Sequence, residues 1–438
     1  MNIHLIDDLP PETSAMLQAL YSRSSKSVVE HVDRVHQTGS DKFMSSYYVG
    51  YGHASIGDCG VTTLFIEDIS LLACKAVQDN QLYSGQESST RYIDFSKQRL
   101  HNPAGSTRGE EILRRWIDFY SASSSKLIDS LKTRFPNVPG TNDKTWAKAI
   151  EARAFDILRG FLPAGVTSQV SWTTNLRQAH ENTLRLELHP LKEVRDLGSK
   201  CRQILIERYP NSFSHQVSDD ELDYLRRVSI AETYNSDEER IRDESAFEVS
   251  STVYSELPAS ARDLLSSRPR RSVVPRALAR YGSFECRFLL DFGSFRDLQR
   301  HRPGICRMPL LSGNYGFNSW YLSQLPGDLR LESQKFVEEQ VRGIQGLLED
   351  GLSTVDAQYY YPLGMNVLCE LHYDLPEMIY VAELRSGQTV HPTLRSVAQR
   401  MAAELLKSYP FIQLHADMRD SSFSVRRGEQ DIVPKNVG

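Results

Sequence analysis

The sequence predicts an α+β protein made of two tandem copies of one sheet-and-helix unit. The first observation is that a run rich in β-branched residues is accompanied by longer segments whose apolar residues recur at helical spacing. The second is that several short elements of the first half return in the second half, in the same order. The third is the length of 438 residues, which is long for one domain and comfortable for two.

The first half is expected to hold one clear strand and several helices. The strand covers 61–66 and follows a Gly-rich turn at 51–58. Helices are expected over 66–78, around 112–131, over 146–161 before Pro163, around His180 and Arg185, and from His189-Pro190 to just before Pro210.

A polar segment separates the two copies. Residues 216–250 contain the acidic runs 219–221 and 237–239, a composition typical of a connection with local helix and no core of its own. We therefore predict a first unit over 1–215, a linker over 216–250 and a second unit over 251–438.

The second half repeats the plan of the first. Its clearest helix has apolar residues at Val337, Val341, Ile344 and Leu348, with i, i+4, i+7, i+11 spacing. Three short elements recur: Pro163-Ala164-Gly165 as Pro362-Leu363-Gly364, Leu184-Arg185 as Leu384-Arg385, and His189-Pro190 as His391-Pro392. Their separations agree closely in the two halves, which predicts an internal repeat.

Charge and composition exclude several classes of function. The net charge of -5 gives no general attraction to nucleic acid or anionic membrane, so the basic cluster 268–271 is expected to be a solvated turn. The six cysteines form no CxxC pair, which argues against a disulfide framework or a metal site. The start lacks a signal-peptide pattern, and no apolar run approaches the roughly 20 residues that span a membrane. We expect a cytoplasmic protein.

Hydroxyl, carboxylate and guanidinium groups gather within 84–91. Arg and Ser side chains bind phosphate oxygens, and a carboxylate can orient an N–H donor. Such a segment suits a small ligand with a phosphate at one end and an amide-like edge at the other, although an ordinary polar loop could also contain these residues. The polar positions are Ser84, Gln86, Glu87, Ser89, Thr90 and Arg91.

This segment resembles the nucleotide-binding end of the signature of flavin-dependent thymidylate synthases. In that family the signature opens with Arg-His-Arg, but here Asp79, Asn80 and Gln81 stand at those positions. Arg-His-Arg occurs instead at 300–302, where the nucleotide-binding end is replaced by Met308, Leu310 and Ser312. Each half therefore keeps the part of the signature that the other has lost.

The resemblance implies a role for residues of both halves. Ser89 would lie near the reacting base and Arg91 on the nucleotide phosphate. Arg385 would be a third catalytic residue, with a helix-surface ion pair as the simpler interpretation of Arg385 and of its counterpart Arg185. The full set of implied nucleotide contacts is Ser84, Gln86, Glu87, Ser89, Thr90, Arg91, Arg177 and Arg300.

The implied flavin contacts come from two places. Arg300, His301 and Arg302 resemble the triplet that contacts FAD, although an isolated run of this kind could be a solvated charge run. His53 and Ser55 match the Gly-His-x-Ser/Thr element that lies upstream in the family, with a plain Gly-rich turn as the alternative.

The resemblance implies C5 methylation of dUMP or a related uridylate. Methylenetetrahydrofolate would donate the carbon, and FAD reduced by NADPH would supply the hydride. Methylation of another pyrimidine nucleotide and a non-catalytic nucleotide- or flavin-binding paralogue remain as alternatives. The family also implies a homodimer that forms a pseudo-tetramer, with one composite site built from unlike halves.

Overall fold

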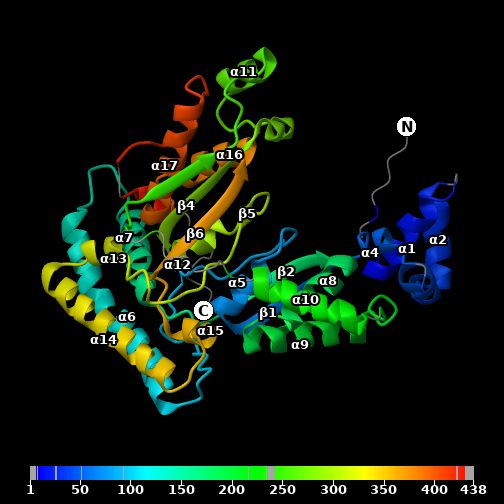
Figure 1. Cartoon of the computed structure of the whole chain (residues 1–438), viewed down its shortest axis with the longest axis horizontal. Helices are drawn as coiled ribbons and strands as arrows, with labels where there is room; N and C mark the ends of the chain where they lie inside the picture. The colour runs from blue at the N-terminus through cyan, green and yellow to red at the C-terminus, as the bar shows by residue number, and fades with distance from the viewer. Residues whose placement is uncertain are drawn as a thin grey trace. The chain divides into compact units, whose positions relative to one another are not determined.

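The computed structural model describes residues 6, 8–24, 27–50, 52–91, 93–215, 217–232, 234, 241, 243–420 and 423–429 (Figure 1). Helices and short strands alternate along the chain, which confirms a mixed α and β protein. Tyr92, which directly follows the polar segment 84–91, lies outside the described residues. The chain forms two compact units, unit 1 over Met1–Ile69, Ala73–Glu87 and Ser168–Thr233, and unit 2 over Ser70–Leu72, Ser88–Thr167 and Tyr234–Gly438.

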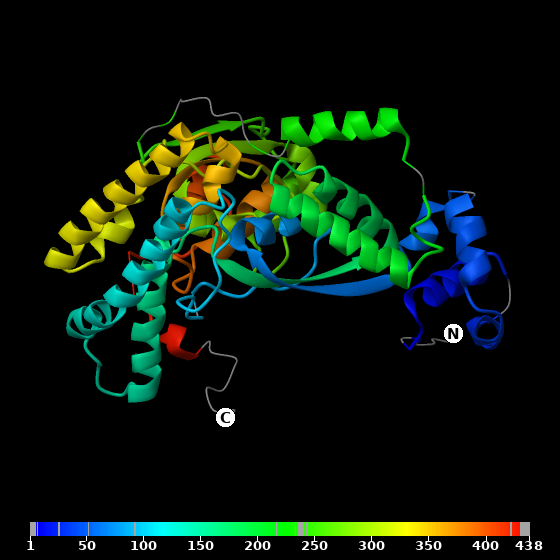
Figure 2. The same cartoon turned by 90° about the horizontal axis from the view of Figure 1, so that it is seen from below.

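Unit 1 contains a two-stranded sheet, β1 (Val61–Ser70) and β2 (Thr167–Asn175). The side chain of Asn175 accepts a hydrogen bond from Gln178 N and so caps the helix that follows β2. Helices α8 and α9 pack against each other in this unit (Figure 2). Its helices are α1 (Pro11–Tyr21), α2 (Val28–Thr38), α3 (Asp41–Phe43), a π-helix (Met44–Gly50), α4 (Ala54–Gly57), α5 (Leu71–Gln78), α8 (Leu176–Glu187), α9 (Lys192–Arg208) and α10 (Asp219–Glu232).

Unit 2 is built on a four-stranded antiparallel sheet in the order β3-β4-β6-β5. The central strands β4 and β6 pair along their whole length, and apolar side chains such as Phe288 and Cys369 are buried there. The strands are β3 (Phe247–Ser251), β4 (Ser283–Asp291), β5 (Ile305–Cys306) and β6 (Asn366–Asp374).

The helices of unit 2 include two long ones that contact each other, α6 and α14. The rings of Phe119 and Phe336 stack at 4.4 Å between them, and Gln340 Nε2 donates to Ile112 O at 2.7 Å. The α-helices are α6 (Thr107–Arg134), α7 (Asp143–Leu158), α11 (Ala259–Ser266), α12 (Phe292–Leu298), α13 (Ser319–Ser323), α14 (Gly327–Glu349), α15 (Thr354–Ala357), α16 (Leu375–Arg385) and α17 (Pro392–Ser408). Single 3₁₀ turns cover Arg159–Phe161, Arg276–Tyr281, Gln358–Tyr360 and Val425–Glu429.

The compact units differ from the predicted boundaries 1–215, 216–250 and 251–438. Residues 88–167 group with the second half of the chain, because α6 packs against α14 and α7 packs against the 3₁₀ turn at Val425–Glu429. The segment predicted as a linker also contains α10 and the start of β3. Because β3 pairs with β4, the end of this segment belongs to the sheet of unit 2.

A set of elements occurs in the same order in both halves of the chain, although β5 and α13 stand between α12 and α14 in the second half only. In each half a strand leads directly into a helix, a long helix follows, and a 3₁₀ turn precedes a second strand that leads into two helices. The corresponding elements are β1 with β4, α5 with α12, α6 with α14, α7 with α15, β2 with β6, α8 with α16 and α9 with α17.

Within unit 2, reciprocal hydrogen bonds join the two Pro-x-Gly turns. Pro163 and Pro362 form an antiparallel bridge at the centre. From donor N to acceptor O, the bonds around it are Ala164 to Tyr361 (2.9 Å), Leu363 to Leu162 (2.8 Å), Gly165 to Tyr359 (2.7 Å) and Gly364 to Gly160 (2.8 Å). Each bond thus has a counterpart with the halves exchanged, as at a two-fold contact.

The main chain beside the turns shows the same correspondence. The residue after each turn accepts a hydrogen bond, through its main-chain oxygen, from the first residue of α5 or α12. The glycine of each turn accepts a main-chain hydrogen bond from a second segment of the chain. The matched bonds are Leu71 N to Val166 O (3.0 Å) with Phe292 N to Met365 O (3.0 Å), and His101 N to Gly165 O (2.8 Å) with Asn318 N to Gly364 O (2.8 Å).

Candidate functional site

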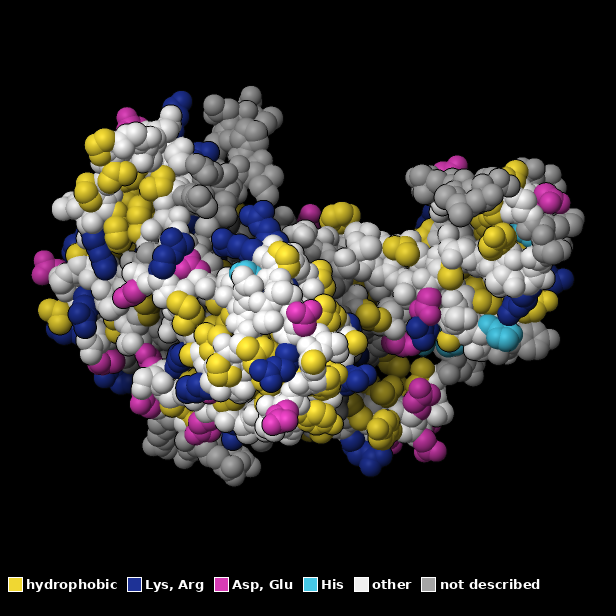
Figure 3. Space-filling view, turned by 90° about the horizontal axis from the view of Figure 1, so that it is seen from above, with side chains coloured by type: hydrophobic (Ala, Val, Ile, Leu, Met, Phe, Trp, Pro, Cys, Tyr) yellow, Lys and Arg dark blue, Asp and Glu magenta, His cyan; other side chains and the backbone are white. Residues whose placement is uncertain are grey.

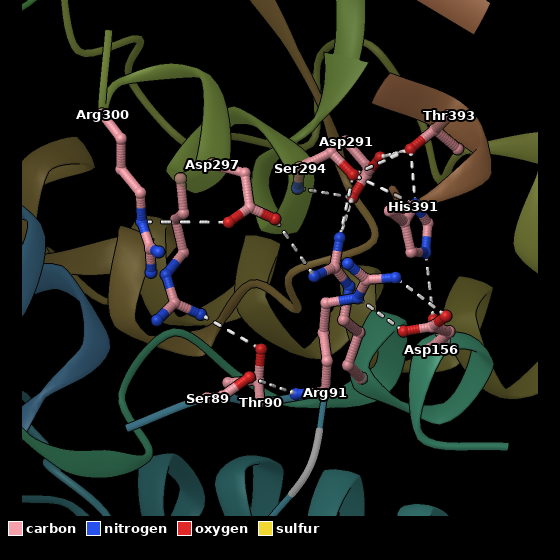
Figure 4. A network of polar contacts seen from close by, with 12 residues as sticks. Ser89, Thr90, Arg91, Asp156, Asp291, Ser294, Asp297, Arg300, His391 and Thr393 are labelled. Atoms are coloured by element: carbon pink, nitrogen blue, oxygen red, sulfur yellow. Dashed lines mark hydrogen bonds and ion pairs between the residues drawn. The ribbon is translucent and has the colours of Figure 1, made fainter. Parts of the chain in front are cut away.

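A network of charged and polar side chains in unit 2 joins residues from both halves of the chain (Figure 4). Ser89, Thr90 and Arg91 come from the polar segment 84–91. Asp291, the last residue of β4, accepts a hydrogen bond from Ser294 N at 2.9 Å and caps α12. His391 stands at the start of α17. Asp291 and His391 therefore lie at the start of helices, where the main chain itself needs partners.

Arg91 makes a bidentate ion pair with Asp156 on α7. Arg91 Nε and Nη2 lie 2.6 Å and 3.0 Å from the two carboxylate oxygens, and Nη2 also donates to Thr389 O at 3.2 Å. Arg427 Nη2 reaches Asp156 Oδ1 at 2.9 Å. Burial alone would raise the pKa of Asp156, but Arg91 and Arg427 hold that pKa well below its usual range.

The cavity beside this pair carries an excess of positive charge. Arg91, Arg153 and Arg427 line it together with the single carboxylate Asp156. Arg153 is buried, and its Nε has no hydrogen-bond partner among the described residues. Burial lowers the pKa of Arg153 to about 10, which still leaves it charged at neutral pH. Such a cluster attracts an anion.

His391 connects Asp156 to Thr393, which in turn contacts Asp291. Its Nε2 is 3.1 Å from Asp156 O, and its Nδ1 is 2.7 Å from Thr393 Oγ1. Thr393 Oγ1 donates to Asp291 Oδ2 at 2.5 Å. Because burial, followed by the neighbouring Arg159, lowers the pKa of His391 well below its ordinary value, the imidazole is neutral and serves as a positioning group.

Arg159 and Thr90 carry the contacts between the halves. The fully buried Arg159 donates from Nη2 to Ser294 Oγ at 2.8 Å, and its Nη1 lies 3.9 Å from Asp297 Oδ2. Thr90 Oγ1 accepts a long hydrogen bond of 3.5 Å from Arg296 Nη1. The end of the polar segment 84–91 thus contacts α12, the helix that precedes Arg300.

Arg300 and His301 follow α12. The Nε of Arg300 lies 3.9 Å from Asp297 Oδ1, and its side chain is 46% exposed. His301 is buried, and its Nε2 accepts a hydrogen bond from Arg385 Nε at 2.8 Å. Arg385 Nη2 also donates to Asp297 O at 2.8 Å. Burial and the adjacent Arg385 lower the pKa of His301 to about 3, so it is neutral with its proton on Nδ1.

The helix-surface ion pairs considered for Arg385 and Arg185 are wrong. Both guanidiniums are half-buried and bind main-chain carbonyls, with Arg185 Nη2 donating to Ala76 O at 3.0 Å within unit 1. Arg185 on α8 lies beside the end of α5, and Arg385 on α16 lies beside the end of α12. The last carbonyl oxygens of a helix have no partner within the helix, and these two arginines donate to them.

Arg91 and His301 line different cavities of the chain. The cavity beside Arg91 has a volume of about 20 Å³, whereas Arg300, His301 and Arg385 line a cavity of about 920 Å³. Asp297 links the two sides of the network, because it lies near Arg159 and Arg300 and its main-chain oxygen accepts from Arg385.

The other predicted nucleotide contacts belong to unit 1. Residues 84–87 lie along the edge of β2, where Thr173 N donates to Ser84 O at 2.7 Å and Ser171 N donates to Gln86 O at 2.8 Å. Glu87 accepts from Gln78 Nε2 at 2.7 Å. Arg177 is held by Asp58, with Nε to Oδ1 at 2.7 Å.

The two predicted flavin contacts of the first half, His53 and Ser55, are exposed at the start of α4 in unit 1. Arg302 is half-buried in the turn after His301 in unit 2. The structure therefore brings Ser89, Thr90 and Arg91 into one unit with Arg300, His301, Arg302 and Arg385.

Several residues of the site were missed by sequence reasoning. Asp156, Arg153 and Arg427 lie in no motif, and Arg427 is far from the others along the chain. Arg296 and Asp297 stand in the run that precedes Arg300, and His391 stands in a recurring dipeptide. These three had a sequence signal, namely their place in a repeated or family-like element.

The fold and the site define an α+β protein with an arginine-rich polar network built from both halves of the chain. Residues 4–211 match the model of the family described as thymidylate synthase complementing protein. The resemblance to flavin-dependent thymidylate synthases that the signature predicts is therefore confirmed for the first half of the chain.

Relatives extend the similarity over most of the chain. A UPF0159 protein of Chlamydia muridarum is 27% identical over 415 residues, which covers 82% of this chain and 77% of the relative. A UPF0159 protein of Chlamydia pneumoniae is 25% identical and covers 85% of this chain and 79% of the relative. A UPF0159 protein of Thermoplasma acidophilum is 22% identical, covering 90% and 92%.

No helix in the described part of the chain is long and apolar enough to cross a membrane. Figure 3 shows basic, acidic and hydrophobic side chains interspersed on the face drawn, without one continuous basic band.

Proposed function

We propose that the protein is a flavin-dependent methyltransferase that methylates C5 of dUMP or a related uridylate. The observation that carries the proposal is one polar network within a compact unit, in which Thr90 contacts Arg296 of α12 and Arg300 contacts Asp297 of the same helix. The two preserved parts of the family signature, more than 200 residues apart in the sequence, thus lie in one network.

The residues beside Arg91 fit the charge of a nucleotide phosphate, and their cavity of about 20 Å³ would have to widen to admit it. Arg91, Arg153 and Arg427 outnumber the one carboxylate beside them, so a phosphate entering this cavity neutralises excess positive charge. Ser89 lies two residues from Arg91, and its Oγ accepts from Arg91 N at 3.3 Å. Asp156 holds Arg91 in a fixed orientation, which reduces the entropy lost when a ligand binds.

The larger cavity fits FAD by its size and charge. Arg300 and Arg385 are cationic donors there, and neutral His301 is held by Arg385. When bound, FAD supplies the hydride that completes the new methyl group. The residues of this chain would hold the cofactor and place positive charge where the substrate and flavin become electron-rich. Methylenetetrahydrofolate and NADPH are the proposed co-substrates, and cytoplasm is the proposed location.

We also propose that the chain arose by tandem duplication and that only one of two equivalent sites is active. The reciprocal bonds of the Pro-x-Gly turns and the repeated element order support the duplication. At the twin site, Asp79 stands in place of Arg300 and Ser312 in place of Arg91. A carboxylate at this position repels an anionic ligand, so the twin should bind neither nucleotide nor flavin. The proposed assembly is a homodimer that forms a pseudo-tetramer.

The direct test is an assay of dTMP formation. The full-length protein is incubated with dUMP, methylenetetrahydrofolate, FAD and NADPH, and the nucleotides are separated chromatographically. We expect dTMP, with turnover reduced about 100-fold or more in Arg91→Ala and in Arg300→Ala. Asp79→Ala serves as the matched control and should leave turnover unchanged.

Other outcomes separate the alternatives. Turnover of another pyrimidine nucleotide but not dUMP would change the substrate and keep the chemistry. Flavin and nucleotide binding without any turnover would support a non-catalytic paralogue. Equal loss of activity in Asp79→Ala and Arg300→Ala would contradict a single active composite site.

A further inference from the structure

A basic turn forms one side of the large cavity in unit 2. Arg268, Arg270 and Arg271 line this cavity together with Arg300 and Arg385. The interpretation of 268–271 as a plain solvated turn is wrong for Arg268, which is 4% exposed. The turn therefore needs a structural explanation, and its position suggests a functional one.

The turn is held in place by buried contacts. Arg268 Nη2 pairs with Glu383 on α16, and Arg268 Nη1 donates to Ser272 O at 2.8 Å, which closes the turn. His415 Nε2 lies 2.9 Å from Arg268 O, and His415 N donates to Glu383 Oε1 at 2.8 Å. Arg268 is thus the anchor that fixes this stretch against α16.

The anchored turn presents two exposed arginines. Arg271 has a φ of 69°, a left-handed conformation that costs a non-glycine residue free energy. Arg270 and Arg271 are both exposed, and neither forms an ion pair within the described residues. The anchored turn thus holds two guanidiniums without a carboxylate partner at the edge of the cavity, where they are available to pair with an anion.

The charge in the cavity is unbalanced. Six arginines line it, and the carboxylates that line it are Glu377 and Glu383. Glu383 is taken by Arg268, and Arg276 pairs with Asp374 at 2.8 Å. The remaining guanidiniums leave a net positive field in a cavity whose volume of about 920 Å³ is large for a single nucleotide.

A buried acceptor in the same cavity also lacks a partner. Glu377 is 6% exposed, and its Oε1 has no hydrogen-bond partner among the described residues. Its distance to His301 Nδ1 is 3.7 Å, too long for a hydrogen bond. A ligand N–H or O–H donor would satisfy this oxygen, so the cavity offers both cationic and acceptor groups to a ligand.

We propose that Arg270 and Arg271 bind the diphosphate of a dinucleotide in this cavity and so select FAD over flavins without a diphosphate. The inference rests on the proposed function, because FAD is the dinucleotide proposed there. Arg300 and Arg385 line the same cavity, so the ligand would lie between the motif residues and the turn.

The test measures flavin binding, not turnover. The full-length protein, freed of flavin, is titrated with FAD, FMN and riboflavin, and binding is followed by the quenching of flavin fluorescence. In the double variant Arg270→Ala, Arg271→Ala we expect FAD affinity to fall about tenfold or more, because two charge-assisted contacts are lost. Riboflavin affinity should not change, and the double lysine variant should recover part of the loss.

The control is Arg280→Ala, since Arg280 is an exposed arginine nearby whose guanidinium lies 5.1 Å from the Tyr281 ring centre. This variant should bind FAD as the wild type does. Unchanged FAD affinity in the double variant, or an equal loss for FAD and riboflavin, would overturn the inference while leaving the proposed function intact. Failure of the wild type to bind any flavin would overturn both.

Discussion

Asp156 is the residue on which the charged network depends most. It is buried, pairs with Arg91 and Arg427, and receives His391 at its main-chain oxygen. Without this carboxylate, the guanidiniums of Arg91 and Arg427 would lie close together in a largely buried site without a counter-charge. The low pKa of Asp156 means that the pair contributes stability above the ordinary carboxyl pKa, and that this contribution is lost as the pH falls toward the folded-state pKa.

We therefore expect Asp156→Asn to lower the free energy of unfolding at neutral pH by about 3–5 kcal/mol. Urea unfolding at a series of pH values checks this, and the gap between variant and wild type should narrow as the pH falls below about 4, where the unfolded wild type gains a proton. Asp129→Asn, which removes an exposed partner of Lys132, should change stability by less than about 0.5 kcal/mol. A loss that is the same at all pH values would contradict the assignment.

At the scale of elements, the two Pro-x-Gly turns are the point where the halves join inside unit 2. The turns have no room for side chains at their glycines. A Cβ on Gly165 would lie 2.8 Å from Tyr359 O, and a Cβ on Gly364 would lie 2.7 Å from Gly160 O. These oxygens accept or flank the reciprocal hydrogen bonds, so they cannot move without breaking the contact.

We expect Gly165→Ala and Gly364→Ala each to destabilise the protein by about 1–3 kcal/mol, because main-chain atoms must shift to admit the methyl group. Gly327→Ala is the control, since a Cβ at this first residue of α14 would have nothing within 4 Å of it. Thermal unfolding followed by circular dichroism measures all three. Similar unfolding temperatures for the three variants would contradict the idea that the two Pro-x-Gly turns hold the halves together.

Local sequence patterns predicted the elements better than the site. The helices around 112–131 and 337–348 follow from apolar spacing and lie within α6 and α14. The recurrence of Pro-x-Gly and His-Pro followed from comparing the halves. The ion pair that anchors the basic turn could not be predicted in this way, because the partner of Arg268 is Glu383 on a helix far along the chain. The same holds for Asp156 and Arg427, which are 271 positions apart.

For the whole molecule, the complementary loss of signature parts in the two halves is a pattern of the sequence alone, and it predicts a composite site. The structure supplies the physical link, because Arg159 and Thr90 from the first half contact Ser294 and Arg296 from the second. What the sequence could not show was the course of the chain, in which 88–167 leaves the rest of the first half and packs with the second.

The most direct measurement is the visible absorption spectrum of the FAD-loaded protein, followed through a titration with dUMP. If one composite site holds both ligands, dUMP should perturb the flavin band in the wild type and in Asp79→Ala. The perturbation should be absent in Arg91→Ala, even though that variant still binds FAD. A spectrum that dUMP leaves unchanged in the wild type, or that responds equally in Arg91→Ala, would contradict the account.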